Sequence, residues 1–356
     1  MESISHKISK TNRSPLDYWV SSLALGDKRD NRLNGVSTKA QSLNQNINDV
    51  CGELDKKLMF ARVSLLGNEQ LEVVISSKTW ERQEGHYPTI TKFFSDVARH
   101  PLLIDKRATF IVWLEDGLWQ WQQEYSMRAP IMAFGRQIYD KCTFLIPDPA
   151  FMEDRGYNRD IKELDDISAR CPWSHRIPSI FWRGAATGLG IEGPNWIKTA
   201  RGRLTLLAKE INDPTFLDAE ITKVSHLPEA QQEIINSKTL VGPPVPFNDF
   251  LKYRYLVDAD GYCCAWKSLF LKLASGSLTL KIQSDYEQWY FHKLAPWINY
   301  VPLKPDLSDL KSVAEWIKEK DSISARIAVC GRQIAEETTY EEALDEVAAI
   351  CEYLAR

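Results

Sequence analysis

The second half of the chain alternates short apolar runs with amphipathic patterns of helical period. Apolar runs rich in β-branched and aromatic residues predict strands at 177–182, 216–222, 255–259, 277–282 and 298–303. Helical periodicity predicts helices at 196–211, 250–254, 265–275 and 286–294. Strands and helices that alternate in this way predict a parallel sheet covered on both faces.

The first half carries the same alternation less regularly. Two apolar runs within 57–76 flank Gly67-Asn68, which predicts a hairpin. A helix is predicted at 89–100, and strands are predicted at 108–114, 130–135 and 143–147. Residues 1–55 are polar and weakly patterned, which indicates a partly irregular arm with short helices. Three helical segments close the chain, and the last begins with a capping box from Thr339 to Glu342.

The length of 356 residues favours two domains. Prolines and polar residues cluster at 171–178, which places the boundary there. We therefore expect an N-terminal α/β domain at 1–175, with 336–356 packing back onto it, and a second α/β domain at 176–335. Two open α/β domains with a cleft between them suit a nucleotide, because ligands of such sheets bind at the carboxyl ends of the strands.

Composition excludes several classes of protein. The net charge of −4 argues against a nucleic acid as the main partner. The seven cysteines are odd in number and form no CxxC pair, which disfavours a disulfide framework or zinc knuckles and favours a reducing compartment. The first residues show no signal-peptide pattern, and no apolar run reaches the roughly 18–20 residues of a membrane helix. We expect a cytoplasmic protein, and contact with a membrane surface stays open.

The segment Asp258-Ala259-Asp260-Gly261 admits two interpretations. Two acids one residue apart could hold a divalent cation that neutralises a nucleotide diphosphate. Alternatively, the strand ends here and a helix from Cys263 or Cys264 offers its free amides to phosphate, with Lys267 close to its first turn. Strand alternation places both acids on one face. One of them could bind a ribose hydroxyl, and Asp260 could simply cap the helix.

Two glycine-containing segments follow the strand at 177–182. GLGIEG at 188–193 matches the dinucleotide fingerprint, and an acid about 20 residues further on would be Glu210 or Asp213. The apolar run ends at Trp182, so the first glycine comes late and a flexible loop is favoured. In FWRG at 181–184, Arg183 could bind phosphate or carboxylate through two parallel hydrogen bonds of its guanidinium, or could pair with a nearby acid across the domain boundary.

Acidic and aromatic residues follow the strand at 108–114. Glu115 and Asp116 come directly after it, and Trp113, Trp119 and Trp121 flank them. A carboxylate among aromatic faces suits sugar binding and general base catalysis. The alternative is an exposed acidic turn whose tryptophans lie in the core. The six histidines are scattered without any metal-binding spacing, so no metal site is expected.

Five segments resemble those of a known family in their sequence, their order and their spacing. They are FWRGAATG, LDAEITK, LKYRYLVDADG, LASGSLTLK and LAPWINYVPLKPDLSDL. Together, residues 108–335 resemble the glycosyltransferase family that includes fungal capsule-associated proteins, Rumi-type protein O-glucosyltransferases and bacterial lipopolysaccharide glycosyltransferases. The resemblance implies a GT-B-like α/β fold with two Rossmann-like domains and a donor cleft between them. It also implies inverting transfer from a UDP-sugar without a metal ion.

Residue roles follow from this resemblance. Asp116 takes the position of the catalytic base, and Trp113, Trp119 and Trp121 become candidates for the acceptor subsite. Ala185 replaces the usual serine after FRG, and Lys267 replaces the usual arginine at the end of the diphosphate-binding segment. The expected donor-binding residues are Arg183, Gly184, Ala185, Arg201, Asp260, Gly261, Tyr262, Cys263, Cys264, Ala265, Trp266 and Lys267.

The absence of a signal-peptide pattern favours the bacterial branch of the family. The expected reaction therefore moves a hexose or pentose from a UDP-sugar to a glycan or lipid-linked saccharide, such as lipopolysaccharide, at the inner face of the inner membrane. Two alternatives stay open. One is an NAD-dependent oxidoreductase that uses GLGIEG, and the other is a nucleotide-sugar-binding homologue that has lost catalysis, since Ala185 and Lys267 depart from the family pattern.

Overall fold

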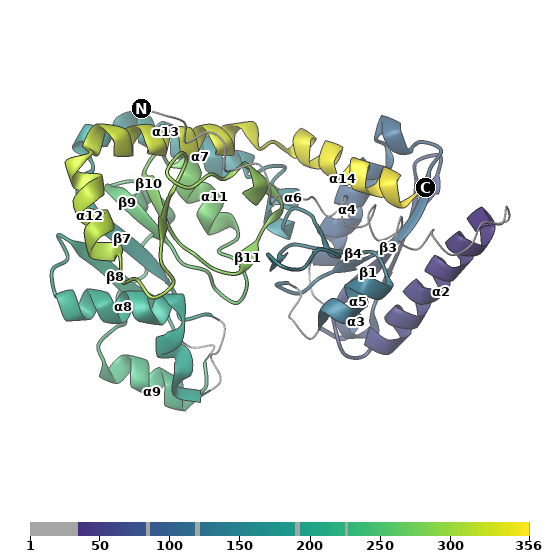
Figure 1. The fold of residues 1–356 in the computed structure, drawn as a ribbon, viewed down its shortest axis with the longest axis horizontal. Coiled ribbons are helices and arrows are strands. Elements are labelled where there is room, and N and C mark those ends of the chain that lie inside the picture. The colour runs from purple at the N-terminus through teal and green to yellow at the C-terminus, as the bar shows by residue number, and fades with distance from the viewer. Residues whose placement is uncertain (1–34, 83–85, 118–121, 189–192, 225–226, 356) are drawn as a thin grey trace, which may run out of the picture. The chain divides into compact units, whose positions relative to one another are not determined.

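The computed structural model describes residues 35–82, 86–117, 122–188, 193–224 and 227–355 (Figure 1). The chain forms two compact units. Unit 1 comprises Met1–Ile146 and Ala343–Arg356, and unit 2 comprises Pro147–Glu342. The two units are described separately below. No helix in the described ranges combines the length and the apolar character that crossing a membrane would need.

Unit 1 is built on a five-stranded sheet of order β2-β1-β3-β4-β6. Its strands are β1 (Phe60–Gly67), β2 (Gln70–Ile75), β3 (Arg107–Trp113), β4 (Ile131–Ala133) and β6 (Phe144–Leu145), and a short strand β5 spans Arg136–Gln137. Its helices are α2 (Gly35–Leu54), α3 (Ser77–Arg82), α4 (His86–Ala98), η1 (Pro101–Leu103) and α5 (Gln123–Arg128). The expected strands at 108–114, 130–135 and 143–147 and the helix at 89–100 are therefore confirmed.

The predicted hairpin at 57–76 is also confirmed. β1 and β2 pair antiparallel, with Val63 opposite Val73. The turn uses Gly67 at φ +80°, followed by Asn68 and Glu69 at positive φ. Glycine and asparagine tolerate this backbone region better than most residues, which explains the turn at this position.

The irregular arm expected at 1–55 is wrong for 35–54, which form the 20-residue helix α2. Ile47, Val50 and Leu54 recur at helical spacing, and all three are buried in one cluster with Ile111 and Trp113 of β3. Before Ile47, the large apolar residues of this segment are Val36 and Leu43. The helical period of the sequence is therefore weak, and the pattern alone does not predict the helix.

Unit 2 is built on a five-stranded sheet of order β12-β10-β9-β7-β8. Its strands are β7 (Ile177–Ala185), β8 (Leu217–Lys223), β9 (Tyr253–Asp258), β10 (Leu278–Ile282) and β12 (Val301–Leu303), with a short strand β11 at Tyr286–Glu287. All neighbouring pairs in this sheet are parallel. The predicted parallel sheet and the α/β class are confirmed, with two units that each contain their own sheet as in GT-B-like proteins.

Helices cover the sheet of unit 2 (Figure 1). They are α6 (Pro149–Glu153), α7 (Asn158–Arg170), η3 (Trp173–His175), η4 (Gly193–Lys198), α8 (Ala200–Ile211), α9 (Glu229–Ser237), α10 (Phe247–Phe250), α11 (Lys267–Ala274), η5 (Trp289–Lys293), α12 (Leu310–Glu319) and α13 (Asp321–Glu337). Side chains from α8, α12 and α13 form one buried cluster with alternate residues of the strands, among them Trp182 and Val257. The intervening strand residues Phe181 and Leu256 pack against α10 on the opposite face.

Two expected elements of unit 2 differ from the structure. Residues 250–254 are not one helix, because α10 ends at Phe250 and β9 already begins at Tyr253. The predicted helix at 286–294 is replaced by β11 and the 3₁₀-helix η5. Aromatic side chains such as Trp289 and Tyr290 are buried here, and this packing overrides the helical period of the sequence.

The boundary between the units lies at Ile146/Pro147, earlier in the chain than the 175/176 boundary expected from the sequence. Helices α6 and α7 belong to unit 2 because their side chains pack there. The Tyr157 ring packs at a tilt against Phe270 of α11, with ring centroids 5.1 Å apart, and Asp160 pairs with Lys267 at 2.6 Å. The last helix, α14 (Tyr340–Leu354), begins with Thr339 accepting the amide of Glu342 at 3.1 Å, which is one half of the predicted capping box. The carboxylate of Glu342 pairs with Lys293 instead of closing the box.

Candidate functional site

Three adjacent parallel strands of unit 2 end at one edge of the sheet. β7 ends at Ala185, β9 at Asp258 and β10 at Ile282, and β9 lies between the other two. The carboxyl edge of such a sheet is where ligands of open α/β folds bind. The residues that follow these strand ends therefore form the candidate site in unit 2.

Arg201, in the first turn of α8, joins two of these strand ends. Its Nε donates to the carbonyl of Ala259 at 3.1 Å, and its Nη1 donates to the carbonyl of Ala185 at 3.0 Å. Nη1 also donates to the Thr187 hydroxyl. Burial lowers the pKa of Arg201, while the charges of Asp258 and Asp260 act in the opposite direction. The guanidinium is thus held rigidly, and its remaining nitrogen, Nη2, lies next to Gly261.

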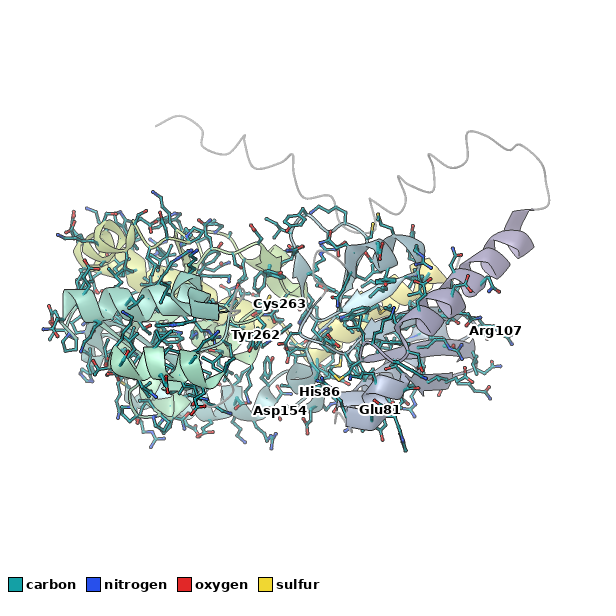
Figure 2. All side chains as sticks on the ribbon, turned by 90° about the horizontal axis from the view of Figure 1, so that it is seen from below. Glu81, His86, Arg107, Asp154, Tyr262 and Cys263 are labelled. Atoms are coloured by element: carbon teal, nitrogen blue, oxygen red, sulfur yellow. The ribbon has the colours of Figure 1, made fainter. Side chains whose placement is uncertain are left out.

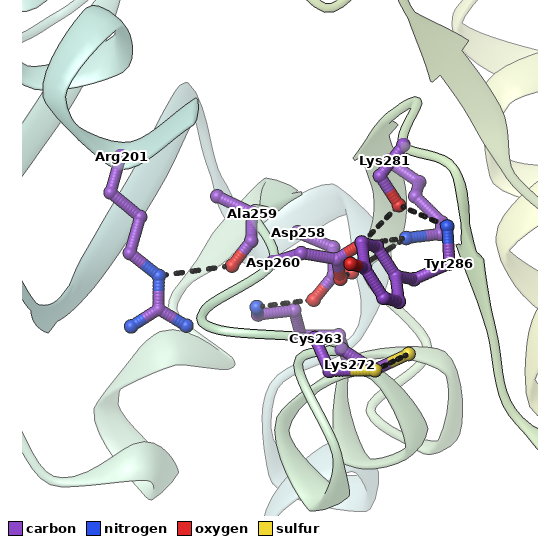
Figure 3. Close-up of polar contacts among 10 residues, drawn as sticks. Arg201, Asp258, Ala259, Asp260, Cys263, Lys272, Lys281 and Tyr286 are labelled. Carbon is purple, nitrogen blue, oxygen red and sulfur yellow. Dashed lines mark hydrogen bonds and ion pairs between the residues drawn. The ribbon is translucent and has the colours of Figure 1, made fainter. Parts of the chain in front are cut away.

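Asp258 and Asp260 face lysines (Figure 3). Lys272 of α11 donates to Asp258 at 2.9 Å, and Lys281 of β10 lies 3.5 Å from Asp258 and 3.4 Å from Asp260. Ser284 also donates to Asp260. The two acids share one face, as strand alternation predicted, and their charges are neutralised by two lysines.

This buried cluster shifts the pKa of its members. Burial would raise the pKa of Asp258, but Lys272 and Lys281 hold it below its usual range. Burial raises the pKa of Asp260. The positive charge of Lys281 acts to lower this pKa, and the negative charge of Asp258 acts to raise it. Burial alone would lower the pKa of Lys281, yet Asp260 and Asp258 raise it. Asp258 and Lys281 are therefore charged at neutral pH.

The turn from Gly261 to Trp266 leads from β9 into α11. Within the described part of the chain, the amides of residues 262–266 donate no hydrogen bond, whereas those of Ser268 and Leu269 donate to the carbonyls of Ala265 and Trp266. Free amides before a helix form an anion-binding arrangement. Trp266 has φ 49°, a conformation uncommon for a large residue, and such strain is often retained at functional sites.

Two expectations about this turn need correction. The helix begins at Lys267 rather than at Cys263 or Cys264. Asp260 does not cap it, because its carboxylate is bonded to Lys281 and Ser284 and the cap residue Trp266 makes no side-chain cap bond. The chain needs the extra residues of the turn to leave the sheet edge before α11 can start.

The side chains of the turn differ in accessibility. Tyr262 is 36% exposed, while Cys263 and Cys264 are each 1% exposed, with their sulfurs 3.8 Å apart (Figures 2 and 3). Burial raises the pKa of Cys264 well above its usual value, so it stays a thiol. A ligand at this turn would therefore meet main-chain amides of the two cysteines rather than their sulfurs.

Lys267, the first residue of α11, pairs with Asp160 of α7 at 2.6 Å. Its ammonium lies 5.8 Å from the centroid of the Tyr157 ring. The lysine is 41% exposed at its side chain, so it stays within reach of an anion at the turn.

Arg183 pairs with two acids of its own sheet, and its expected contact with the donor stays a prediction. Its Nη2 lies 2.7 Å from Asp218 and 2.8 Å from Glu220, both on the neighbouring strand β8. Pairing with an acid is the alternative interpretation, but the partners lie on the neighbouring strand of the same unit rather than across the domain boundary. Register explains it, because Arg183 lies opposite Glu220 in the parallel pair β7–β8.

Packing within β7 requires glycine at position 184, and the expected contact of Gly184 with the donor stays a prediction. A Cβ atom at Gly184 would lie 2.6 Å from the Trp182 ring. Ala185, expected to contact the donor, ends β7 and gives its carbonyl to Arg201. Ala185 thus supports Arg201 through its main-chain carbonyl.

In unit 1, Asp116 is exposed just beyond the end of β3. Its neighbour Glu115 accepts the amide of Met59 at 3.3 Å, and partial burial raises the pKa of Glu115. Trp113 is 0% exposed and packs in the core of unit 1, which removes it from an acceptor subsite. Trp119 and Trp121 lie outside the described residues, as do four residues of GLGIEG.

Sequence reasoning missed Thr187, Lys272, Lys281 and Ser284. The sequence did carry a signal for the two lysines. Each stands inside an apolar run, in FLKLA and LTLKI, and a lysine inside a buried element needs an acidic partner. The described residues contain no group of three or more histidine, cysteine or acidic side chains arranged to hold a metal ion.

Comparison with known proteins agrees with the resemblance. Residues 150–347 match the family described as Glycosyl transferase family 90. The chain therefore belongs to this family. The matched region contains the whole carboxyl edge of the sheet in unit 2, but it begins after Asp116, whose role stays a prediction.

Individual relatives are similar over less of the chain. Protein O-glucosyltransferase 3 of Rattus norvegicus is 39% identical over 159 residues, which cover 41% of this chain and 30% of the relative. Uncharacterized protein 179R of Invertebrate iridescent virus 6 is 30% identical over 184 residues, which cover 45% of this chain and 15% of that protein. The match thus spans less than a third of the length of these two relatives. The bacterial branch stays a prediction.

Among solved structures, Anabaena HepE in complex with UDP is similar over 74% of this chain and 76% of its own. The sequence identity is 11% and the TM-score is 0.42.

Proposed function

We propose that this protein transfers a hexose or pentose from a UDP-sugar to an acceptor hydroxyl, with inversion and without a metal ion. The single observation that carries this proposal is the turn at 261–266 within the region matched to glycosyl transferase family 90. The turn combines free amides with an anchored guanidinium and the amino end of a helix. These are the groups that bind a diphosphate.

The donor diphosphate binds at this turn in our proposal. Gly261 leaves space for it, since a side chain there would meet Thr187 at 2.9 Å and Arg201 at 3.2 Å. Negative charge grows on the departing UDP as the glycosidic bond breaks, and Arg201 and Lys267 stabilise it. Lysines already neutralise Asp258 and Asp260, so these acids need no divalent cation.

Asp116 is the general base in this mechanism. It removes the proton of the acceptor hydroxyl while that oxygen attacks the anomeric carbon. The bond from this carbon to the diphosphate breaks in the same displacement, and its electron pair leaves with UDP. A single displacement of this kind inverts the configuration of the anomeric carbon.

The acceptor in our proposal is a hydroxyl of a glycan, such as lipopolysaccharide or another surface polysaccharide. A protein hydroxyl is the second candidate, because the rat relative is named a protein O-glucosyltransferase. The cytoplasmic location expected from the sequence stays a prediction.

Slow transfer to water tests the proposal without knowledge of the acceptor. We expect the protein to hydrolyse one UDP-sugar of a panel in EDTA, and proton NMR to show that an α-linked donor first releases the β-anomer. First release of the α-anomer would overturn inversion. Binding of UDP without turnover of any donor, with or without acceptor glycans, would instead identify a homologue that has lost catalysis.

A further inference from the structure

Beneath the diphosphate turn lies a group of buried charges that no donor contact explains. Asp258 is 0% exposed, Lys272 2%, Lys281 6% and Asp260 7%. Burying ion pairs costs solvation energy, and apolar residues of similar size are often at least as stabilising. Stability alone is thus a weak reason for four buried charges at this position.

Lys281 is the centre of this group (Figure 3). It lies opposite Asp258 in the β9–β10 register, and its ammonium reaches both Asp258 at 3.5 Å and Asp260 at 3.4 Å. Asp260 directly precedes Gly261, the first residue of the turn, and is also held by Ser284 from the loop after β10. One ammonium therefore ties the last residue of β9 and the start of the turn to the adjacent strand.

The two lysines of the group contact different acids. Lys272 donates to Asp258 alone and fixes α11 to the end of β9. Of the two lysines, Lys281 is the one that contacts Asp260, at both carboxylate oxygens. The position of the free amides after Gly261 thus depends on a contact that Lys281 makes and Lys272 does not.

We propose that Lys281 is a positioning residue for donor binding: by holding Asp260, it fixes where the diphosphate turn leaves the sheet. This inference rests on the proposed function, because it assigns the turn to the UDP moiety. Lys281 itself touches no donor atom and acts through Asp260 and the main chain of the turn.

A double substitution separates positioning from charge compensation. Lys281→Met leaves the two acids with one lysine, whereas Lys281→Met combined with Asp260→Asn restores the charge balance around Asp258 and Lys272. We expect the double variant to recover most of the thermal stability that Lys281→Met loses. Its dissociation constant for UDP should stay raised by about tenfold, as for loss of one charge-assisted anchor. If Lys281→Met does not fold, the double variant carries the test alone.

Arg176→Met is the matched control. Arg176 is also buried, at 4% exposed, but it serves the amino edge of the same sheet, where it donates to Ser277 at 2.6 Å and to the carbonyl of Ser275 at 3.0 Å. We expect it to lower the melting temperature without changing the dissociation constant for UDP. A double variant that regains wild-type UDP affinity would overturn the proposal. It would show that charge balance alone, without the contact between Lys281 and Asp260, is enough for UDP binding.

Hydrogen exchange separates this inference from the proposed function. The amides of Ser268 and Leu269, which donate to the carbonyls of Ala265 and Trp266 in the turn, should exchange faster in the double variant than in the wild type. Their exchange should be unchanged in Arg176→Met. If exchange is faster in the double variant but the wild type does not bind UDP, the proposed donor is wrong. The role of Lys281 in positioning the turn would then still stand. Unchanged exchange in the double variant would overturn the positioning role itself.

Discussion

Replacing Asp116 with asparagine is expected to lower turnover of the UDP-sugar by about 10²- to 10⁴-fold, the usual contribution of a general base. Asparagine has nearly the same shape as aspartate but cannot accept the proton of the acceptor hydroxyl. The dissociation constant for UDP should not change, because the proposed UDP contacts lie in unit 2. Steady-state rates together with UDP titration measure both quantities.

Glu115→Gln is the matched control for this prediction. Glu115 is the adjacent carboxylate at the end of β3, but it accepts the amide of Met59 and is partly buried. Glutamine can keep that bond, so turnover should stay within a few-fold of the wild type. If Glu115→Gln abolishes turnover while Asp116→Asn does not, the base has been assigned to the wrong residue. If neither variant affects turnover, unit 1 supplies no base from this strand end.

Replacing Arg201 with methionine should weaken UDP binding by about 10- to 100-fold, as expected when a charged donor to phosphate is lost. Stability should also fall, because the guanidinium bonds the carbonyls of Ala185 and Ala259 at the ends of β7 and β9. Loss of such a buried hydrogen-bonded group costs about 1–3 kcal/mol. Calorimetric titration and chemical denaturation measure the two effects.

Arg203 offers a control two residues along the same helix. It donates to the carbonyl of Pro305 at 2.8 Å, an exposed contact. Arg203→Met should change neither UDP affinity nor unfolding free energy by more than a small amount. If Arg201→Met loses stability yet binds UDP as the wild type does, Arg201 only stabilises the fold. The donor diphosphate would then bind away from Arg201.

The periodic parts of the fold could be predicted from the sequence. The hairpin at 57–76 and the strands at 177–182, 216–222 and 277–282 carry strong apolar patterns, and all of them form. The helix at 35–54 does not follow from the sequence, because the segment is mostly polar before Ile47 and its helical period is weak. The segment at 286–294 was misassigned because buried aromatic packing outweighs its helical period.

The candidate site was predicted unevenly for a physical reason. Residues that act through their main chain after a strand end, such as Gly261, can be predicted from the sequence of the strand and turn alone. Pairings across strands do not, because they depend on register: Arg183 lies opposite Glu220, and Lys281 lies opposite Asp258. For Trp113 the sequence favours the core when taken alone, whereas the resemblance suggests a sugar subsite, and its burial decides for the core.

Titration of UDP into the purified protein in the presence of EDTA tests the central claim most directly. The account predicts saturable binding at one site that is unchanged by manganese or magnesium, and no binding of NAD. Binding that requires a divalent cation would contradict it, since Asp258 and Asp260 would then be metal ligands rather than partners of Lys272 and Lys281. Binding of NAD instead of UDP would assign the glycine-rich segment at 188–193 to a dinucleotide and remove the donor site from the turn.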